Sequence, residues 1–544
     1  MDHGQSRAGH GARHGHGRLA GNVGRWRDGR LCDRLPHPEP VSPPVWGREG
    51  ALAASYLPVL SEQIERNRAG GWQLASVTLT WLAIGLAGIV LVGETLVGIL
   101  WLANPHHPRL ELLLGLVAVM LPYLFCICLA AQVSATLHAL HHFGTPAFVP
   151  VLLNIVWILG ALVIAPWWAT DKSSQAYVLA ISVLCGGVLQ LAIQLPILHR
   201  LGFRYDYDWP AARQGVSRIV ATLLPMLLGL AVTQINTLLD SLMAWVFSSP
   251  QPRTPIGWLG DSWDYPLRQG AAGAIYYGER LYQLPVGVLG ITVATVIFPL
   301  LSRHAARGDR DKIGADLSLG LRLVLFLAVP AAAGLFLLAE PVARLLFQRG
   351  EFLPEDTLRT ARMIRCYALG VWAYCALPVL VRGFYAQQDP HTPLRIGLGV
   401  VSCNFLLNLV LIWPLAEAGL AVSTAVAAAL QVGWLAVAFA RKSGHLDWWE
   451  MSGTLLRSIV ATAAMYGAGL AVLGSLPDDG GLTHQMVAVL APLIVCLAVY
   501  LAVSHALGSG EWRLLTSRQG KSSDARNDLG QMRGRDRGGN GSAS

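Results

Sequence analysis

Long apolar segments, separated by short polar loops, run along the chain from Gly71 to about Gly508. Most of them hold about 20 residues or more, which is enough for an α-helix to cross a hydrocarbon layer about 30 Å thick. A backbone inside lipid has no water to bond to, so each segment is predicted to be a helix. The pattern predicts twelve spans, at residues 72–104, 110–136, 148–168, 176–198, 217–247, 271–301, 316–346, 360–386, 394–414, 417–440, 451–474 and 484–507. The predicted fold class is an all-α polytopic membrane protein.

The composition supports a membrane protein and excludes several other classes. Of the 544 residues, 53% are hydrophobic and 14% are charged, against about 25% charged in an ordinary soluble domain. Secreted, fibrous and nucleic-acid-binding proteins are therefore excluded. The net charge of +8 does not indicate a nucleic-acid partner, because the arginines collect in certain loops and near the two ends of the chain.

The basic residues are unevenly divided between the two sides of the predicted membrane. If successive loops alternate sides, one side carries 13 Lys and Arg residues, namely Arg66, Arg68, Arg200, Arg204, Arg213, Arg218, Arg303, Arg307, Arg310, Lys312, Arg395, Arg441 and Lys442. The other side carries five, namely Arg109, Lys172, Arg253, Arg268 and Arg349. Positive charge accumulates in cytoplasmic loops. We therefore expect the richer side, and the C-terminus with it, to be cytoplasmic.

Two short strings recur at similar offsets and indicate an internal repeat. Pro58-Val59-Leu60-Ser61 returns as Pro299-Leu300-Leu301-Ser302, and Thr145-Pro146 returns as Thr392-Pro393, at offsets of 241 and 247 residues. Parallel repeats of this kind are common in transporters, where the substrate site lies between them. We predict a truncated N-terminal lobe at 49–198, a C-terminal lobe at 217–441, two extra helices at 451–507 and a disordered cytoplasmic tail at 511–544.

The repeat also suggests that a piece is missing near the beginning of the chain. The second Pro-x-Leu-Ser string ends a long span that has another span before it, whereas residues 1–48 contain no apolar run of even ten residues. One explanation is a disordered leader. The other is a shifted reading frame, because codons that spell 33–47 can encode an amphipathic helix with two adjacent arginines when read one base later. We favour the second explanation, in which 1–48 is a frameshifted leader that replaces two helices.

Motifs in the second half of the chain carry a family resemblance. The run from Tyr276 through Gly290, continued by Phe298-Pro299-Leu300-Leu301-Ser302, resembles a signature of the MurJ (MviN) family of lipid II flippases. Further matches are Pro122-Tyr123, Pro146-Ala147-Phe148 with Leu152-Leu153-Asn154, and Arg382-Gly383-Phe384-Tyr385-Ala386 with Asp389 and Thr392-Pro393. The family belongs to the multidrug/oligosaccharidyl-lipid/polysaccharide exporter superfamily. The resemblance covers about Glu49 to Leu507 and implies two pseudo-symmetric lobes with fourteen helices, two more than the pattern predicts here.

The resemblance implies a function, a location and partners. Such proteins move undecaprenyl-pyrophosphate-linked peptidoglycan precursor from the cytoplasmic to the periplasmic leaflet of the bacterial inner membrane by alternating access, for cell-wall synthesis. The expected partners are lipid II and membrane lipids. We expect a monomer, no enzymatic activity, no nucleic-acid partner and no cofactor other than a coupling Na⁺.

The pyrophosphate of that substrate calls for cationic groups inside the membrane. Arginine suits this role because its planar fork binds two phosphate oxygens at once. An arginine within a span is a functional candidate, since it is costly to leave facing lipid. Arg280 lies about ten residues inside its span beside Glu279, with Gln283 on the same helix face. These three are the predicted substrate-binding residues, although an internal Glu–Arg ion pair is the alternative for Arg280 and Glu279.

The sequence departs from the family pattern at this predicted site. The family often has a carboxylate at the position of Gln283, so a proton-relay role there is weakened. The family's arginines in its first two helices occur here only in the shifted frame. Gly278, Pro285, Gly287 and Gly290 loosen the helix around Arg280, and we predict that they form a hinge.

A second group of polar residues could hold a cation. Asp240 lies deep in the span 217–247, Asn404 and Asn408 share one helix face, and Thr424 lies on the next helix. All four offer oxygen ligands, and the resemblance implies that some family members are sodium-coupled at matching positions. The alternative is that these side chains only join helices by hydrogen bonds.

Three other functions stay open at this point. The first is a cation-coupled drug or polysaccharide-lipid exporter of the same superfamily, which would not need Arg280. The second is a membrane-embedded enzyme acting on polyprenyl-linked sugars with His141 or His142 as base, but no acid–base cluster or metal-binding motif accompanies these histidines. The third is an inactive product of a damaged reading frame.

Overall fold

The computed structural model describes residues 51–104, 108–249, 254–256, 260–443, 446–476 and 481–511. The predicted leader at 1–48 and residues 512–544 of the predicted tail lie outside the described residues. What is described is almost entirely helical, so the predicted fold class is confirmed.

The first half of the described chain consists of long helices, two of which are linked by a wider π-helical turn. In order these are α1 (Ala51–Arg66), α2 (Arg68–Ala103), α3 (Pro108–Ala139), α4 (Gly144–Leu159), the π-turn η2 (Gly160–Ile164), α5 (Ala165–Trp168), α6 (Lys172–Arg200) and α7 (Trp209–Val246). The helices α2, α3, α4 and α6 pack on one another, and α1 packs across α2, α3 and α7. Tyr56 and Leu60 of α1 are fully buried in this contact.

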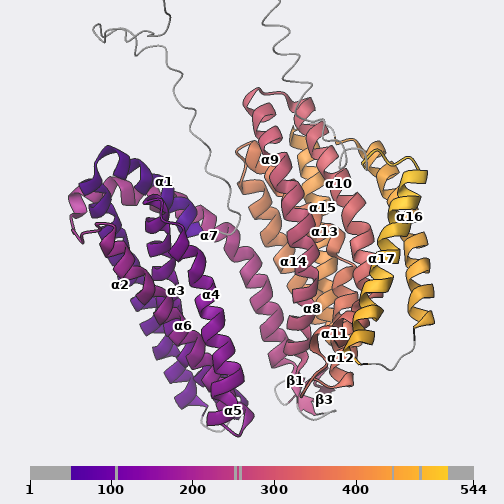
Figure 1. Cartoon of the computed structure of the whole chain (residues 1–544), viewed down its shortest axis with the longest axis horizontal. Coiled ribbons are helices and arrows are strands. Elements are labelled where there is room, and N and C mark those ends of the chain that lie inside the picture. The colour runs from indigo at the N-terminus through magenta and orange to yellow at the C-terminus, as the bar shows by residue number, and fades with distance from the viewer. Residues whose placement is uncertain are drawn as a thin grey trace, which may run out of the picture. The chain divides into compact units, whose positions relative to one another are not determined.

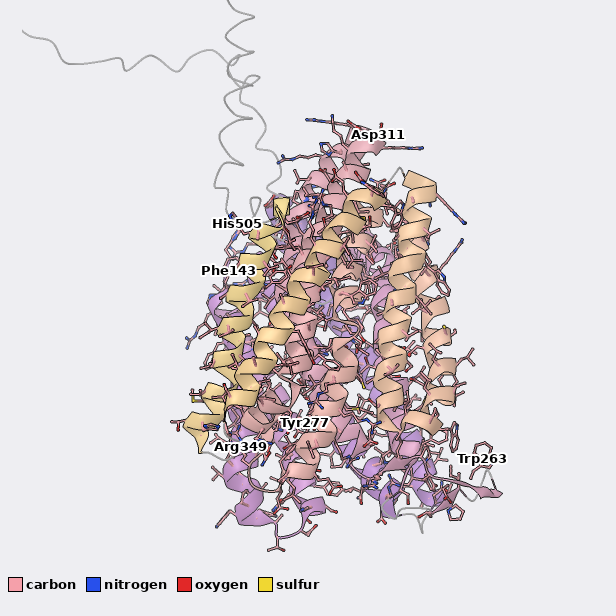
Figure 2. All side chains as sticks on the ribbon, turned by 90° about the vertical axis from the view of Figure 1, so that its right-hand side faces the viewer. Phe143, Trp263, Tyr277, Asp311, Arg349 and His505 are labelled. Carbon is pink, nitrogen blue, oxygen red and sulfur yellow. The ribbon has the colours of Figure 1, made fainter. Side chains whose placement is uncertain are left out.

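The second half repeats the all-helical pattern. Its elements are α8 (Ala271–Pro285), the π-turn η3 (Val286–Gly290), α9 (Ile291–Ala306), α10 (Arg310–Leu337), α11 (Ala339–Phe347), α12 (Pro354–Ala368), α13 (Val371–Ala386), α14 (His391–Leu415), α15 (Glu417–Ser443), α16 (Trp448–Ser475) and α17 (Leu482–Ala506). The largest buried cluster lies among α9, α10, α13 and α15, around Leu317, Val379 and Phe439. Figure 2 shows Asp311 and Arg349, which flank α10 and α11, at opposite ends of the helices.

Short strands occupy the connection between α7 and α8. Strand β1 (Ser248–Ser249) pairs in parallel with β4 (Leu267–Arg268), and β2 (Pro255–Ile256) pairs in antiparallel fashion with β3 (Gly260–Asp264). The sequence pattern did not predict these strands, because two-residue pairings leave no measurable periodicity.

Aspartate side chains mark the beginnings of four helices. Asp171, Asp208, Asp309 and Asp447 each accept a hydrogen bond from a backbone N–H in the first turn of α6, α7, α10 and α16. The first N–H groups of a helix have no partner within it, so an aspartate at this position supplies one. These caps explain why the apolar helices begin where they do.

The predicted number of spans is only partly matched. In the part of the chain that the structure describes, ten helices are long and apolar enough to cross a membrane, and α12 with α13 makes an eleventh if this pair, bent by 44°, is counted as one span. The predicted span 217–247 corresponds to α7, which lies outside that set. The count of twelve therefore stays a prediction, as does the division into two lobes.

Two predicted spans are interrupted in the structure. The predicted span 316–346 was too long, because α10 ends at Leu337 and α11 follows as a separate short helix. Pro341 has no N–H to donate to the carbonyl of Leu337, so the hydrogen-bond ladder stops there. The predicted span 360–386 breaks at Leu369 and Gly370, where glycine weakens the helix.

The last two helices form a hairpin that packs on α10. Helices α16 and α17 lie side by side (Figure 1), and both contact α10. Buried side chains fill the contact, and the Tyr500 hydroxyl donates a hydrogen bond to the carbonyl oxygen of Phe326. This contact joins the C-terminal part of α17 to the middle of α10.

A buried charge pair closes one end of the same contact. Glu511 is fully buried, and its Oε1 accepts hydrogen bonds from Arg322 Nη2 at 2.6 Å and from Thr454 Oγ1 at 2.7 Å. Arg322, which lies on α10, also pairs with Glu450 on α16. Glu511, the first residue of the tail predicted at 511–544, is thus held by α10 and α16.

We predict that Glu511→Gln loosens the packing of α16 and α17 on α10. Removing one partner of a buried ion pair costs roughly 3–5 kcal/mol, and we expect about 2 kcal/mol here because Arg322 keeps Glu450 as a partner. Thermal unfolding in detergent and hydrogen exchange along α17 measure the effect. Glu450→Gln is the matched control, because this half-exposed carboxylate contributes less. Equal stability of Glu511→Gln and the parent protein would contradict the prediction.

The same ion pair predicts that the packing of α16 and α17 on α10 depends on pH. Burial raises the pKa of Glu511, but hydrogen bonds from Thr454 and Arg322 outweigh it and hold the pKa below its usual value. A carboxylate with a lowered folded-state pKa stabilises the protein above its unfolded-state pKa, and the contribution disappears as the pH falls through the folded-state value. Loosening of α17 in the parent protein is therefore expected only below about pH 4.

Candidate functional site

Helix α8 carries Arg280. About one and a half turns beyond this residue, the helix is locally widened. Pro285 has no N–H to donate, and directly after it the backbone forms the π-turn η3, in which Ile291 N–H bonds to the carbonyl oxygen of Val286. Such π-turns are frequent at functional sites. The helices α8 and α9 nevertheless form one continuous span, Ala271–Ala306.

The four predicted hinge residues lie around this turn, in different environments. A Cβ atom added at Gly278 would lie 2.7 Å from Met363 Cβ, and one added at Gly290 would lie 2.8 Å from Cys375 Cα. Both glycines therefore allow a close approach, of α12 to α8 and of α13 to η3. A Cβ added at Gly287 would meet nothing within 4 Å. Gly278 and Gly290 thus have a packing role, while Gly287 has no packing reason to be glycine.

The three predicted substrate-binding residues are joined by hydrogen bonds. Arg280 Nη1 donates to Gln283 Oε1 at 2.9 Å, and Gln283 Nε2 donates to Glu279 Oε1 at 2.9 Å. The guanidinium carbon of Arg280 lies 4.6 Å from the centroid of the Tyr276 ring. Gln283 therefore stands between the cation and the carboxylate and orients both.

Arg280 remains available for an anion. It is exposed in the structure, and among the described residues it makes no ion pair, with Glu279 or with any other carboxylate. An internal Glu–Arg ion pair, the alternative for these residues, is not what the structure contains. The arrangement presents a cation with free N–H groups inside a membrane span.

The four residues of the predicted cation site come together from three helices. Asp240 of α7 accepts hydrogen bonds from Asn408 Nδ2 of α14 at 2.5 Å and from Thr424 Oγ1 of α15 at 3.2 Å. Asn404 lies one turn from Asn408 and donates to Asn236 Oδ1 at 2.7 Å. Asp240 is only 7% exposed, and Asn404 and Asn408 are fully buried.

Two members of this cluster were missed by sequence reasoning. Asn236 donates to Asp240 Oδ2 at 3.5 Å, and Ser423 donates to Asn408 Oδ1. Asn236 stands four residues before Asp240, so the helical period could have found it. Ser423 adjoins Thr424, and only the packing of α15 on α14 shows that both neighbours reach the cluster.

The donor set fits a small hard cation such as Na⁺. Carboxylate, amide and hydroxyl oxygens are the ligands that such ions prefer. Among the described residues Asp240 forms no ion pair, and the buried Oδ1 of Asn404 has no hydrogen-bond partner. The same contacts also join α7, α14 and α15, so the interpretation as interhelical hydrogen bonds remains compatible with the structure.

An aromatic cluster lies between the two groups of residues. The Tyr282 ring, three residues after Glu279, stacks on Tyr374 with centroids 4.6 Å apart and lies 4.9 Å from Tyr367. Tyr282 also packs against a buried cluster that includes Met243, three residues after Asp240. The aromatic residues of α8 and the turn of α7 after Asp240 therefore adjoin the same buried cluster.

Comparisons with known proteins give one family. The family model "Lipid II flippase MurJ" matches residues 47–491. A "Probable lipid II flippase MurJ" from Vibrio cholerae is 31% identical over 480 residues, which cover 85% of this chain and 86% of the relative. The match thus extends over most of the length of both proteins.

Solved structures give the same fold. A structure described as "Lipid II flippase MurJ, inward closed conformation" matches 84% of this chain and 88% of its own, with a TM-score of 0.64 and 21% identity. A multidrug resistance MATE family transporter in an inward-facing conformation, of the MOP superfamily, matches 72% of this chain and 87% of its own, with a TM-score of 0.56 and 14% identity. The long family match and the level of identity show that the chain belongs to the lipid II flippase MurJ family, a family of membrane transporters and not of enzymes.

Proposed function

We propose that this chain moves lipid II from the cytoplasmic to the periplasmic leaflet of the bacterial inner membrane by alternating access. The observation that carries the proposal is Arg280, a cation inside a membrane span that makes no direct ion pair among the described residues. Family membership supports lipid II as the substrate and peptidoglycan synthesis as the process.

Arg280 would bind the pyrophosphate of the substrate. A guanidinium can give two parallel N–H bonds to phosphate oxygens, and its attraction for an anion is strengthened where water is scarce. Gln283 would hold the guanidinium in place through its present bond, while Glu279 would limit the excess positive charge when the substrate leaves. The Tyr276 ring supports the cation from one side.

The Asp240 cluster would bind the coupling ion. A buried carboxylate without a cationic partner is costly, and a bound Na⁺ would remove that cost. The unpaired Oδ1 of Asn404 would be an additional ligand. Since Tyr282 and Met243 pack in one cluster, ion binding near Asp240 would bias the position of α8 and hence of Arg280.

The orientation in the membrane would follow from the distribution of charge. The loops richer in Lys and Arg would face the cytoplasm, together with the C-terminus. The protein would act as a monomer within the membrane lipid. A drug exporter of the same superfamily is the second candidate, but it gives no reason for an unpaired Arg280.

Transport by the purified protein tests the proposed function. In proteoliposomes that contain lipid II, the full chain is expected to make the head group accessible on the opposite leaflet. The full chain is also expected to restore growth of bacteria depleted of their lipid II flippase. Transport of cationic drugs without lipid II flipping would favour the exporter, and absence of both activities would favour the inactive product.

We predict that Arg280→Gln lowers lipid II flipping by about tenfold or more, since a hydrogen bond to a charged group contributes roughly 1.5–3 kcal/mol. Arg280→Lys should keep part of the activity, because a lysine retains charge but not the planar fork. Arg395→Gln, at an exposed position on α14, is the matched control. Wild-type flipping by Arg280→Gln would refute the assignment of this residue.

We predict that Asp240→Asn abolishes Na⁺ binding and makes transport independent of Na⁺. The amide has nearly the shape of the carboxylate, so the variant removes charge with little change in packing. Binding of radioactive sodium to the detergent-purified protein is the measurement. Ser241→Ala is the control, because that exposed hydroxyl bonds only to its own helix. If the parent protein binds no sodium, the cluster has only the role of joining helices.

We predict opposite results for two glycines of the predicted hinge. Gly287→Ala should slow transport without loss of stability, because alanine stiffens the helix by about 1 kcal/mol and meets no neighbour. Gly290→Ala should lower stability by about 1–3 kcal/mol, because its Cβ would contact the backbone at Cys375. Transport rates and thermal unfolding of both variants distinguish the effects. Normal transport by Gly287→Ala would show that bending at this position is not required.

A further inference from the structure

A cavity lies between the N-terminal parts of α10 and α16, at the end of the molecule where Figure 2 labels Asp311. Its volume is about 410 Å³. The residues that line it include Asp311, Ser318 and Arg322 of α10, and Asp447 and Glu450 at the beginning of α16. Three of these five residues are acidic and one is basic, so the lining carries a net negative charge.

The one cation of this lining is already shared between two carboxylates. Arg322 pairs with Glu450 and, through Nη2, donates to Glu511 Oε1 at 2.6 Å. Among the described residues, Asp311 and Asp447 form no ion pair, and the buried Oε2 of Glu511 has no hydrogen-bond partner. The cavity and its wall thus hold four carboxylates for one arginine. Their mutual repulsion favours a basic ligand at this place.

The chain leaves the described part of the structure beside this cavity. Glu511 is the last described residue, and its partner Arg322 lines the cavity. The next ten residues, 512–521, hold no Asp or Glu and three basic side chains, namely Arg513, Arg518 and Lys521. Residues 522–544 hold four Arg and three Asp, so their charges largely cancel. The uncompensated positive charge is therefore concentrated in the segment that directly follows the cavity wall.

The length of this segment brings its basic side chains within reach of the cavity. An extended chain covers up to about 3.6 Å per residue, so Arg518 can lie up to roughly 25 Å from Glu511 and Lys521 up to roughly 36 Å. A ligand on a short tether also has a high effective concentration, which falls as the tether lengthens. Both arguments favour 513–521 over the more distant basic residues as the occupant.

We propose that residues 513–521 dock in this cavity, where Arg518 and Lys521 pair with Asp311 and Glu450. The docked segment would add a second link between α10 and α16, beside the one that Arg322 makes. It would thereby hold the hairpin of α16 and α17 against α10 at this end. The inference concerns binding within the chain, and it does not rest on the identity of the transported substrate.

Photocross-linking within the full chain tests the proposal. Benzoylphenylalanine in place of Gln519 would stand beside Arg518, and irradiation in nanodiscs is expected to join it to peptides from 310–322 and 446–456. Mass spectrometry identifies these peptides. Asp311→Asn should lower the yield about twofold to fivefold, the factor that one exposed ion pair contributes to an equilibrium. Thermal unfolding of this variant should match the parent protein, because Asp311 makes no ion pair among the described residues.

Two pairs of variants with equal changes of charge separate docking from general attraction. Asp311→Asn with Glu450→Gln should lower the yield about fivefold or more, whereas Glu65→Gln with Glu355→Gln removes two exposed carboxylates outside the cavity and should leave it unchanged.

In the segment itself, changing Arg513, Arg518 and Lys521 to Gln should abolish the cross-links. The same change at Arg533, Arg535 and Arg537 should preserve them, because these residues lie beyond the proposed segment.

Three results would overturn the proposal. The first is a parent chain that gives no cross-links to α10 or α16. The second is an equal yield in the parent protein and in Asp311→Asn with Glu450→Gln, or an equal loss in the two triple variants, which would show attraction without a defined site. The third is cross-linking to phosphatidylglycerol in place of the two helices, which would show that the segment lies on anionic lipid.

Discussion

An ionised side chain inside a hydrocarbon layer raises the free energy unless a counter-charge, hydrogen bonds or a ligand compensates for it. The roles of the polar residues in this chain follow from how each one meets that cost. Arg322 and Glu511 compensate each other and hold the last two helices. Arg280 makes no direct ion pair among the described residues and bonds to the amide of Gln283 instead. Arg322 and Arg280 thus differ in their partners, which are carboxylates for the first and an amide for the second.

The Asp240 cluster meets the same cost in another way. Asn408, Thr424 and Asn236 donate hydrogen bonds to the carboxylate but bring no positive charge. These hydrogen bonds join α7, α14 and α15. The buried cluster that contains Met243 of α7 also packs against Tyr282 of α8.

The helix α8 and its continuation combine close packing with a local defect. Gly278 and Gly290 let α12 and α13 approach closely, and between them Pro285 and η3 interrupt the regular hydrogen-bond ladder. Packed helices resist continuous deformation, so motion concentrates where the ladder is irregular. Arg280 lies just before that irregular turn, where a change in bend would move it relative to α12.

The sequence by itself determined the helical membrane architecture, because each apolar segment long enough to cross a bilayer has no alternative to a helix. It also singled out Arg280, Glu279 and Gln283 as candidates, and the four oxygen-bearing residues Asp240, Asn404, Asn408 and Thr424, since helical spacing and the rarity of charge in apolar segments both leave a signal in the sequence. The ends of α10 and the break between α12 and α13 required the structure, because a hydropathy pattern does not register where one hydrogen bond is missing.

Only the tertiary structure decided which residues far apart in the sequence bond to one another. Glu511 reads as part of a polar tail, yet it is buried because Arg322, 189 positions earlier, lies opposite it. Asn236 and Ser423 complete the Asp240 cluster only because α7, α14 and α15 meet there. Sequence spacing specifies which side chains share a helix face, while the packing of helices specifies which faces meet.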